Sequence, residues 1–96
     1  MIRTQTMELL ARHKAELARR FGVGTLALFG STVRNMARED SDVDILVSFD
    51  GPATSARYFG VQFYLEDLLG RPVDLVTDKA LRRELRPYVE NEAVYV

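Results

Sequence analysis

The runs Leu26-Ala27-Leu28-Phe29-Gly30-Ser31 and Ser41-Asp42-Val43-Asp44-Ile45-Leu46-Val47 decide the fold of this chain. The first lies in a predicted strand over 25–29, whose nearly continuous apolar side chains are typical of a strand buried on both faces. The second predicts a strand over 42–49, in which successive side chains point to opposite faces. Its valines and isoleucine belong to a core, so the two aspartates lie side by side on the other face.

The segments around these two strands predict a small domain of helices and strands. Apolar residues at helical spacing predict a helix over 4–21, which Gly22 and Gly24 end. The remaining elements are predicted as a short helix 32–37 with Ser31 as N-cap, helix 55–69, strand 73–76, helix 79–85 before Pro87 (which can open a further turn), and an extended tail 93–96. This order indicates an α/β (α+β) fold with helices packed on a small mixed β-sheet of three to four strands.

Length and composition limit what kind of protein this can be. A chain of 96 residues is expected to form one domain, residues 1–96, because two halves would each be too small for a sufficient core. The chain is 47% hydrophobic with a net charge of −1, so no overall basic field attracts nucleic acid. It has no cysteine, which excludes disulfides and thiolate zinc sites. We find no secretory signal and no apolar run long enough for a membrane span, and therefore expect a cytoplasmic protein without a membrane partner.

The paired aspartates are the first candidate for chemistry. Carboxylates two residues apart on a strand raise each other's pKa, and burying them without a counter-charge is costly. A divalent cation such as Mg²⁺ removes that cost, because hard oxygen ligands suit it. Asp74 interrupts the next apolar strand in the same way, and would join Asp42 and Asp44 if the two strands are neighbours. The alternative is that these aspartates are only turn or capping residues at strand starts.

The turn at Gly30-Ser31 supports the functional interpretation. A glycine directly after a buried strand lets the backbone approach a phosphate closely, and the free N–H groups at a helix start favour an anion. A Gly-Ser pair alone is weak evidence. Followed by paired carboxylates on the next strand, it indicates an anion site beside a metal site. Two metal ions that bridge a triphosphate can activate an attacking oxygen and stabilise leaving pyrophosphate, which is nucleotidyl transfer.

The pattern Gly30-Ser31-Thr32-Val33-Arg34, then Ser41-Asp42-Val43-Asp44, resembles the G-S-x-x-R…S-D-x-D signature of the DNA polymerase β-like nucleotidyltransferase superfamily. The size resembles the minimal nucleotidyltransferases (MNT proteins) that pair with HEPN-domain RNase toxins. The resemblance implies that Asp42, Asp44 and Asp74 are catalytic metal ligands. It implies that Gly30 and Ser31 hold the triphosphate, with Arg34 as a phosphate or carboxylate partner. Val33 and Asn35 depart from the commoner Ala and Gly, which leaves substrate details open.

The resemblance also implies a reaction and a partner. It suggests an antitoxin that uses two Mg²⁺ ions to transfer AMP from ATP to a tyrosine of a cognate HEPN toxin. A short chain fits a protein acceptor, since it has little surface with which to enclose a second small substrate. The alternatives are an antitoxin that acts by binding alone and a nucleotidyltransferase for small molecules. Direct nucleic-acid binding is not expected, and the sequence leaves the oligomeric state open.

Three other features receive structural interpretations. The four aromatic residues of the helix 55–69 nearly encircle it, and we expect them to fill a small core more readily than to form a docking surface. They are Tyr58, Phe59, Phe63 and Tyr64. His13 lies near the edge of an apolar stripe and is expected to be structural or exposed. The arginines in the segment 82–86 have glutamates among and after them, the last being Glu92. This mixture of charges predicts a solvated surface.

Overall fold

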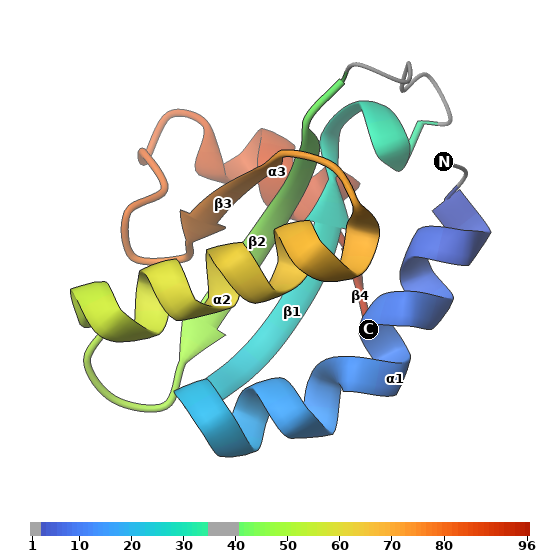
Figure 1. The fold of residues 1–96 in the computed structure, drawn as a ribbon. Helices are drawn as coiled ribbons and strands as arrows, with labels where there is room; N and C mark the ends of the chain where they lie inside the picture. Colours follow the sequence, from blue (N-terminus) through green and yellow to red (C-terminus); the bar gives the residue numbers. More distant parts are fainter. Residues whose placement is uncertain (1–2, 35–40) are drawn as a thin grey trace.

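The structure, a computed structural model, describes residues 3–34 and 41–96. Along the chain its elements are α1 (Arg3–Phe21), β1 (Val23–Phe29), the 3₁₀ helix η1 (Gly30–Thr32), β2 (Val43–Phe49), α2 (Ser55–Leu69), β3 (Val73–Thr77), α3 (Arg86–Glu92) and β4 (Val94–Tyr95). Figure 1 shows the long helices α1 and α2 packed across the strands. The predicted mixture of helices and strands is confirmed.

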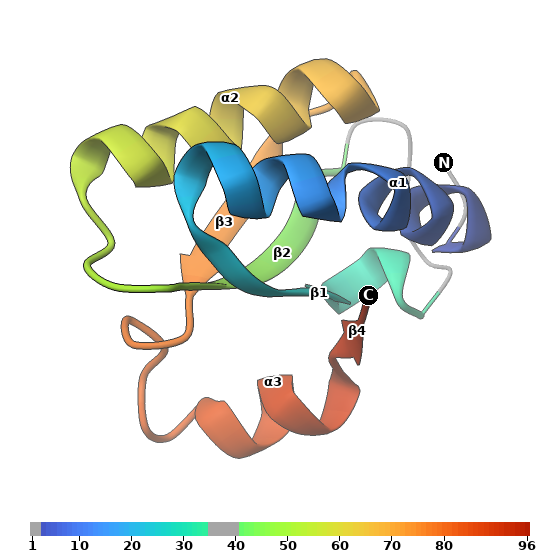
Figure 2. The same ribbon diagram turned by 90° about the horizontal axis from the view of Figure 1, so that it is seen from below.

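The described strands form a four-stranded mixed sheet in the order β3-β2-β1-β4. Strand β1 pairs antiparallel with both β2 and β4, whereas β2 and β3 run parallel. Figure 2 shows α1 and α2 on one face of the sheet and the short α3 on the opposite side. The predicted extended tail is strand β4, whose Val94 and Tyr95 pair with Leu28 and Ala27.

The main core lies between the sheet and the two long helices. Alternate residues of β2, namely Val43, Ile45 and Val47, are buried there, as the period-2 pattern predicts. From the helices the core receives Leu10, Leu17, Val61, Leu65 and Leu69. Because successive strand residues point to opposite faces, Asp44 and Leu46 lie on the face toward α3. The polar site is thus separated from the core by the thickness of the sheet.

Helices α1 and α2 approach each other closely at a glycine. A Cβ added at Gly60 of α2 would stand 2.4 Å from an edge carbon (Cε1) of the Phe21 ring of α1. The helix therefore gives up the better helix propensity of alanine at this position in exchange for close packing. The Phe21 ring also contacts Tyr64 edge-on, with ring centroids 6.2 Å apart.

Two expected boundaries around β1 are wrong. Gly22 has φ 72° and ends α1, but Gly24 lies inside the strand, which begins at Val23. Ser31 is not an N-cap: it lies within η1, whose N-cap position is Phe29, and no side chain caps that turn. The backbone already turns at Gly30, so the helical turn begins earlier than expected. The later part of the expected helix 32–37 falls outside the described residues.

The expected helix over 79–85 is also wrong. This segment forms turns, and Thr77 accepts hydrogen bonds from the Ala80 N–H through both its carbonyl (3.1 Å) and its hydroxyl (3.2 Å). The helix begins instead at Arg86, because Pro87 in its first turn has a fixed φ and lacks the N–H that an interior position needs. The expectation that Pro87 can open a further helical turn is confirmed.

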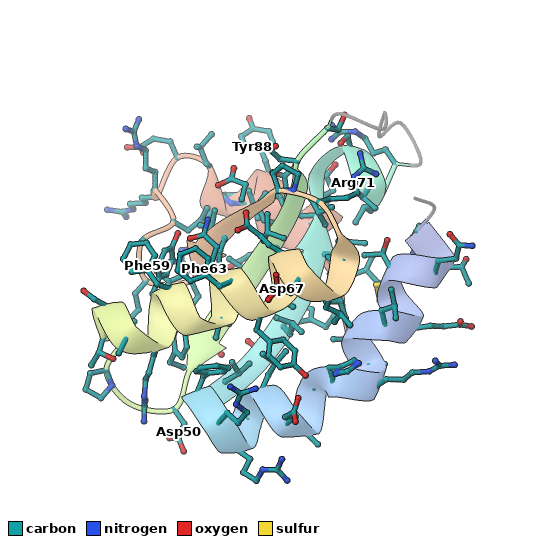
Figure 3. The ribbon with its side chains drawn as sticks, viewed as in Figure 1. Asp50, Phe59, Phe63, Asp67, Arg71 and Tyr88 are labelled. Atoms are coloured by element: carbon teal, nitrogen blue, oxygen red, sulfur yellow. The ribbon has the colours of Figure 1, made fainter. Side chains whose placement is uncertain are left out.

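The aromatic residues of α2 divide into two groups. Tyr58 packs on the core and donates to the Leu75 carbonyl at 2.5 Å, and Tyr64 also packs there. The expectation of core packing is wrong for Phe59 and Phe63, which are 50% and 60% exposed. Figure 3 shows these two rings side by side along the edge of α2 that faces away from α1. They lie off the apolar stripe that the sheet covers.

His13 has the structural role expected of it. Its Nδ1 lies 2.6 Å from the hydroxyl of Tyr64, which also contacts Glu16. These contacts join α1 to α2. Across the described segments, neither long helix nor any shorter one has the length and apolar character that a membrane crossing requires.

Candidate functional site

Parallel pairing of β2 and β3 brings the predicted carboxylates together. Asp44 and Asp74 are direct partners in the register, so their side chains share one face of the sheet. The Val43 N–H donates to the Pro72 carbonyl at 2.9 Å, which aligns the starts of the two strands. The condition that the sequence left open, that these strands are neighbours, is met.

The three aspartates differ in their environments. Asp42 precedes β2 and is exposed, and Asp74 is exposed on the edge strand β3. Asp44 is half-buried between them, and its pKa is raised to about 6. Burial is the largest cause, followed by Asp74, by charge and through a hydrogen bond, and then by the charges of Asp42 and Glu92. The charges of the surrounding carboxylates therefore act together on Asp44.

A divalent cation fits this donor set chemically. The side-chain groups that raise the pKa of Asp44 are all carboxylates, so a positive ion there would reverse the main repulsions. Carboxylate oxygens are also the ligands that Mg²⁺ takes in proteins. In residues 3–34 and 41–96, however, no three acidic or histidine side chains are already arranged closely enough to enclose a metal ion. Asp74 already makes a hydrogen bond with Asp44, so binding would require a rearrangement of the side chains around this pair.

The predicted phosphate turn packs directly against the central carboxylate. Gly30 is buried and has φ 77°, and a Cβ on it would stand 2.0 Å from Asp44 Oδ2. No side chain fits at position 30 with this geometry, which is a stronger reason for glycine than the turn alone. Ser31 follows, half-buried in η1. An anion held at this turn would lie next to Asp44.

A fourth carboxylate belongs to this cluster, and sequence reasoning missed it. Glu92, the last residue of α3, accepts a hydrogen bond from the Gly30 N–H at 3.2 Å and a charge-assisted one from Arg34. Arg34 therefore has a carboxylate partner, one of the two kinds expected of it. Nothing in the sequence relates Glu92 to a turn 62 residues away, because this contact depends on the placement of α3 beneath the sheet.

Two further polar residues surround the site. Arg71, labelled in Figure 3, donates to the Ser41 carbonyl at 3.0 Å and so secures the backbone just before Asp42. Thr32 is 1% exposed, and within the described segments its hydroxyl oxygen has no hydrogen-bond partner. The site is thus built from the end of β1, the starts of β2 and β3, the turn η1 and the end of α3.

Comparison with known proteins agrees with the chemistry that this geometry indicates. Residues 10–96 match the family model for a nucleotidyltransferase domain. The protein adenylyltransferase MntA of Thermococcus cleftensis is 47% identical over 88 residues, which cover 92% of this chain and 89% of that protein. A solved structure provisionally assigned as a minimal nucleotidyltransferase superposes with a TM-score of 0.78 at 38% identity, covering 98% of this chain and 95% of that one.

More distant solved structures share the fold. A toxin–antitoxin structure with AMP-PNP has a TM-score of 0.72 at 22% identity, over 88% of this chain and 69% of that one. A complex of an MNT antitoxin with the tri-AMPylated HEPN toxin of Shewanella oneidensis has a TM-score of 0.65 at 21% identity, over 92% and 69%. At these identities the likeness concerns the arrangement of helices and strands alone.

Proposed function

Because this chain belongs to the nucleotidyltransferase domain family, we propose that it is a protein adenylyltransferase that moves AMP from ATP to a partner protein. The main support for this proposal is the strand register that places Asp44 beside Asp74, with the Gly30 turn packed on Asp44. A metal site and an anion site therefore share one carboxylate. The name of the 47% identical relative, a protein adenylyltransferase, supports the same activity.

Each site residue has a role in the proposed reaction. Asp42, Asp44 and Asp74 would hold two Mg²⁺ ions, which when bound supply charge neutralisation for the triphosphate and activation of the attacking oxygen. The Gly30 and Ser31 backbone and Arg34 bind the phosphates. The acceptor hydroxyl oxygen forms a bond to the α-phosphorus, the bond from that phosphorus to the β-bridging oxygen breaks, and pyrophosphate leaves. The hydroxyl proton passes to a neighbouring carboxylate or to water.

The acceptor we propose is a tyrosine hydroxyl of a HEPN-domain toxin, with the chain acting as its antitoxin. The open sheet edge near Asp74 and the exposed position of Asp42 leave the site accessible to a large partner. The structural neighbour that carries an AMPylated HEPN toxin supports this choice of partner. Transfer would add a bulky anion to the toxin.

The test is transfer of label from α-³²P ATP to the purified product of the neighbouring gene, with and without Mg²⁺. Asp44→Asn and Asp74→Asn should each lower transfer by at least about a hundredfold, because a developing charge loses its counter-ion. Asp67→Asn is the matched control, since it removes the same charge from an exposed position on α2. Absence of Mg²⁺-dependent transfer by the wild type would refute the enzymatic assignment, whereas full transfer by Asp44→Asn would refute the role given to Asp44.

Two other functions predict different results in this experiment. An antitoxin that acts by binding alone would neutralise toxin RNase activity equally with wild type and with Asp44→Asn, without labelling. A nucleotidyltransferase for small molecules would leave the toxin unlabelled and transfer the label to a low-molecular-weight acceptor. The half-buried Asp44 favours catalysis, because a protein that only binds gains nothing from a carboxylate whose pKa is raised by its neighbours.

A further inference from the structure

Helix α3 places an internal anion on the turn that we assign to the triphosphate. Glu92 is the last residue of α3, the helix that Figure 2 shows on the opposite side of the sheet from α1 and α2. One carboxylate oxygen, Oε2, accepts from the Gly30 N–H at 3.2 Å, and the other, Oε1, accepts from Arg34. The Glu92 side chain is only 24% exposed, so these contacts are partly shielded from water.

These two donors are the ones a phosphate would use. A carboxylate and a phosphate both accept hydrogen bonds through anionic oxygens, and a backbone N–H with an arginine suits either. One N–H cannot serve two anions at full strength. Glu92 in its present position also adds a negative charge to a region that already holds three aspartates, where it would repel the triphosphate.

We propose that Glu92 competes with the nucleotide triphosphate for the Gly30 N–H and Arg34, and so lowers the affinity of the enzyme for ATP. The inference rests on the proposed function, since it takes this turn as the triphosphate site. ATP binding then requires the carboxylate to leave the turn and Arg34 to change partner. The effect is a higher Kd for ATP, so that at low ATP concentration the Glu92 carboxylate occupies these two donors.

The movement involves the Glu92 side chain and leaves the C-terminal backbone in place. Strand β4 follows directly and pairs with β1, and the Val96 N–H donates to the Leu26 carbonyl at 3.0 Å. At the other end of α3, Arg86 donates to the Asp78 carbonyl at 2.6 Å. The backbone is therefore held on both sides of Glu92, whereas its side chain has three rotatable bonds that can move it away from the turn.

Direct nucleotide binding tests this proposal without depending on turnover. Calorimetric titration with the non-hydrolysable α,β-methylene analogue of ATP and Mg²⁺ should give a Kd for Glu92→Gln that is lower than that of wild type by on the order of tenfold. Glu90→Gln is the control: it removes the same charge from the same helix, where Glu90 pairs with Arg86 at 3.0 Å. Its Kd should stay within about twofold of the wild-type value.

Each outcome is decisive. An unchanged or higher Kd for Glu92→Gln, with the wild type binding nucleotide, overturns the competition. Absence of nucleotide binding by wild type and Glu92→Gln alike overturns the proposed function, and the competition with it. If Glu92→Gln loses AMP transfer while its Kd is unchanged, Glu92 acts on the acceptor and the competition is again wrong. Thermal melting of all three proteins checks that they are equally folded.

Discussion

Gly30 lies against Asp44 so closely that a Cβ at position 30 would stand 2.0 Å from the Oδ2 atom of that carboxylate. The contact joins the end of β1 to the centre of the acidic cluster. It explains why the turn proposed to bind the phosphates and the carboxylates lie together although they belong to different strands. A change of residue 30 should therefore affect both the stability of the protein and its activity.

Gly30→Ala should therefore destabilise the protein and abolish AMP transfer. The methyl group must displace Asp44, and alanine is strained at φ 77°, so we expect a loss of about 2 kcal/mol or more in urea unfolding. Gly70→Ala is the control, because Gly70 has φ 66° but its Cβ would meet nothing within 4 Å. That variant should lose about 1 kcal/mol and keep its activity. Equal losses of stability and activity in both would contradict this account.

The raised pKa of Asp44 should make the metal-free protein less stable as the pH rises. The folded state holds a proton on Asp44 up to about pH 6, whereas the unfolded chain loses it near pH 4. The folded state binds more protons in that window, so this group makes the free energy of unfolding fall between about pH 4 and 6 and stay lower above it. In EDTA at pH 7.5, Asp44→Asn should be more stable than wild type by about 1 kcal/mol, after allowance for solvent screening.

The control for this prediction is Asp67→Asn, measured at pH 7.5 and at pH 4. Asp67 is exposed on α2, labelled in Figure 3, and its replacement should not reproduce the pH-dependent gain. At pH 4 the advantage of Asp44→Asn should vanish, because the wild-type carboxyl is then protonated in the folded state. An Asp44→Asn variant that is less stable than wild type at pH 7.5 would show that Asp44 contributes a favourable contact.

Mg²⁺ should stabilise the wild-type protein. An ion that binds only the folded state raises the free energy of unfolding, by about 1–3 kcal/mol at concentrations well above its Kd. The gain should be largest at neutral pH, where the carboxylates are ionised, and should be lost in the double variant Asp42→Asn/Asp44→Asn. Differential scanning calorimetry with Mg²⁺ and with EDTA measures it. Equal stabilisation of the double variant would mean that the ion binds elsewhere.

Gly60→Ala should destabilise the protein although alanine favours helices. The added methyl group would stand 2.4 Å from the Phe21 ring, and the two helices would have to separate. We expect a net loss of about 1–3 kcal/mol in urea unfolding, because overpacking outweighs the gain of about 1 kcal/mol in helix propensity. The double variant Phe21→Leu/Gly60→Ala should recover part of it. A Gly60→Ala variant as stable as wild type would show that the Phe21 ring can move aside freely.

The sequence predicted the elements whose apolar period is long and uninterrupted. Helices α1 and α2 and the alternating strand β2 end within a few residues of their predicted bounds, since their burial follows directly from spacing. The neighbouring position of Asp74 could be expected only conditionally, because strand order is a property of the whole chain. The helix expected over 79–85 lies instead at Arg86–Glu92, because a proline is favoured in the first turn of a helix and not at its end.

The part of the site that could not be predicted depends on contacts across the chain. Glu92 looks like a surface glutamate among other charges, and only the position of α3 brings it to Gly30 and Arg34. Likewise, the spacing of Phe59 and Phe63 does not tell which side of α2 the sheet covers. Local patterns give the chemistry of each residue, whereas its partners come from the tertiary fold.

The pairing of Asp44 with Asp74 has a consequence for how the chain reaches its native structure. If β3 slipped by one residue against β2, Asp74 would turn into the hydrocarbon core beneath α2 and Leu75 would take its place outside. Both changes are costly, so misaligned forms of the sheet are strongly disfavoured. The carboxylate proposed for catalysis therefore also helps to specify the alignment of the two strands.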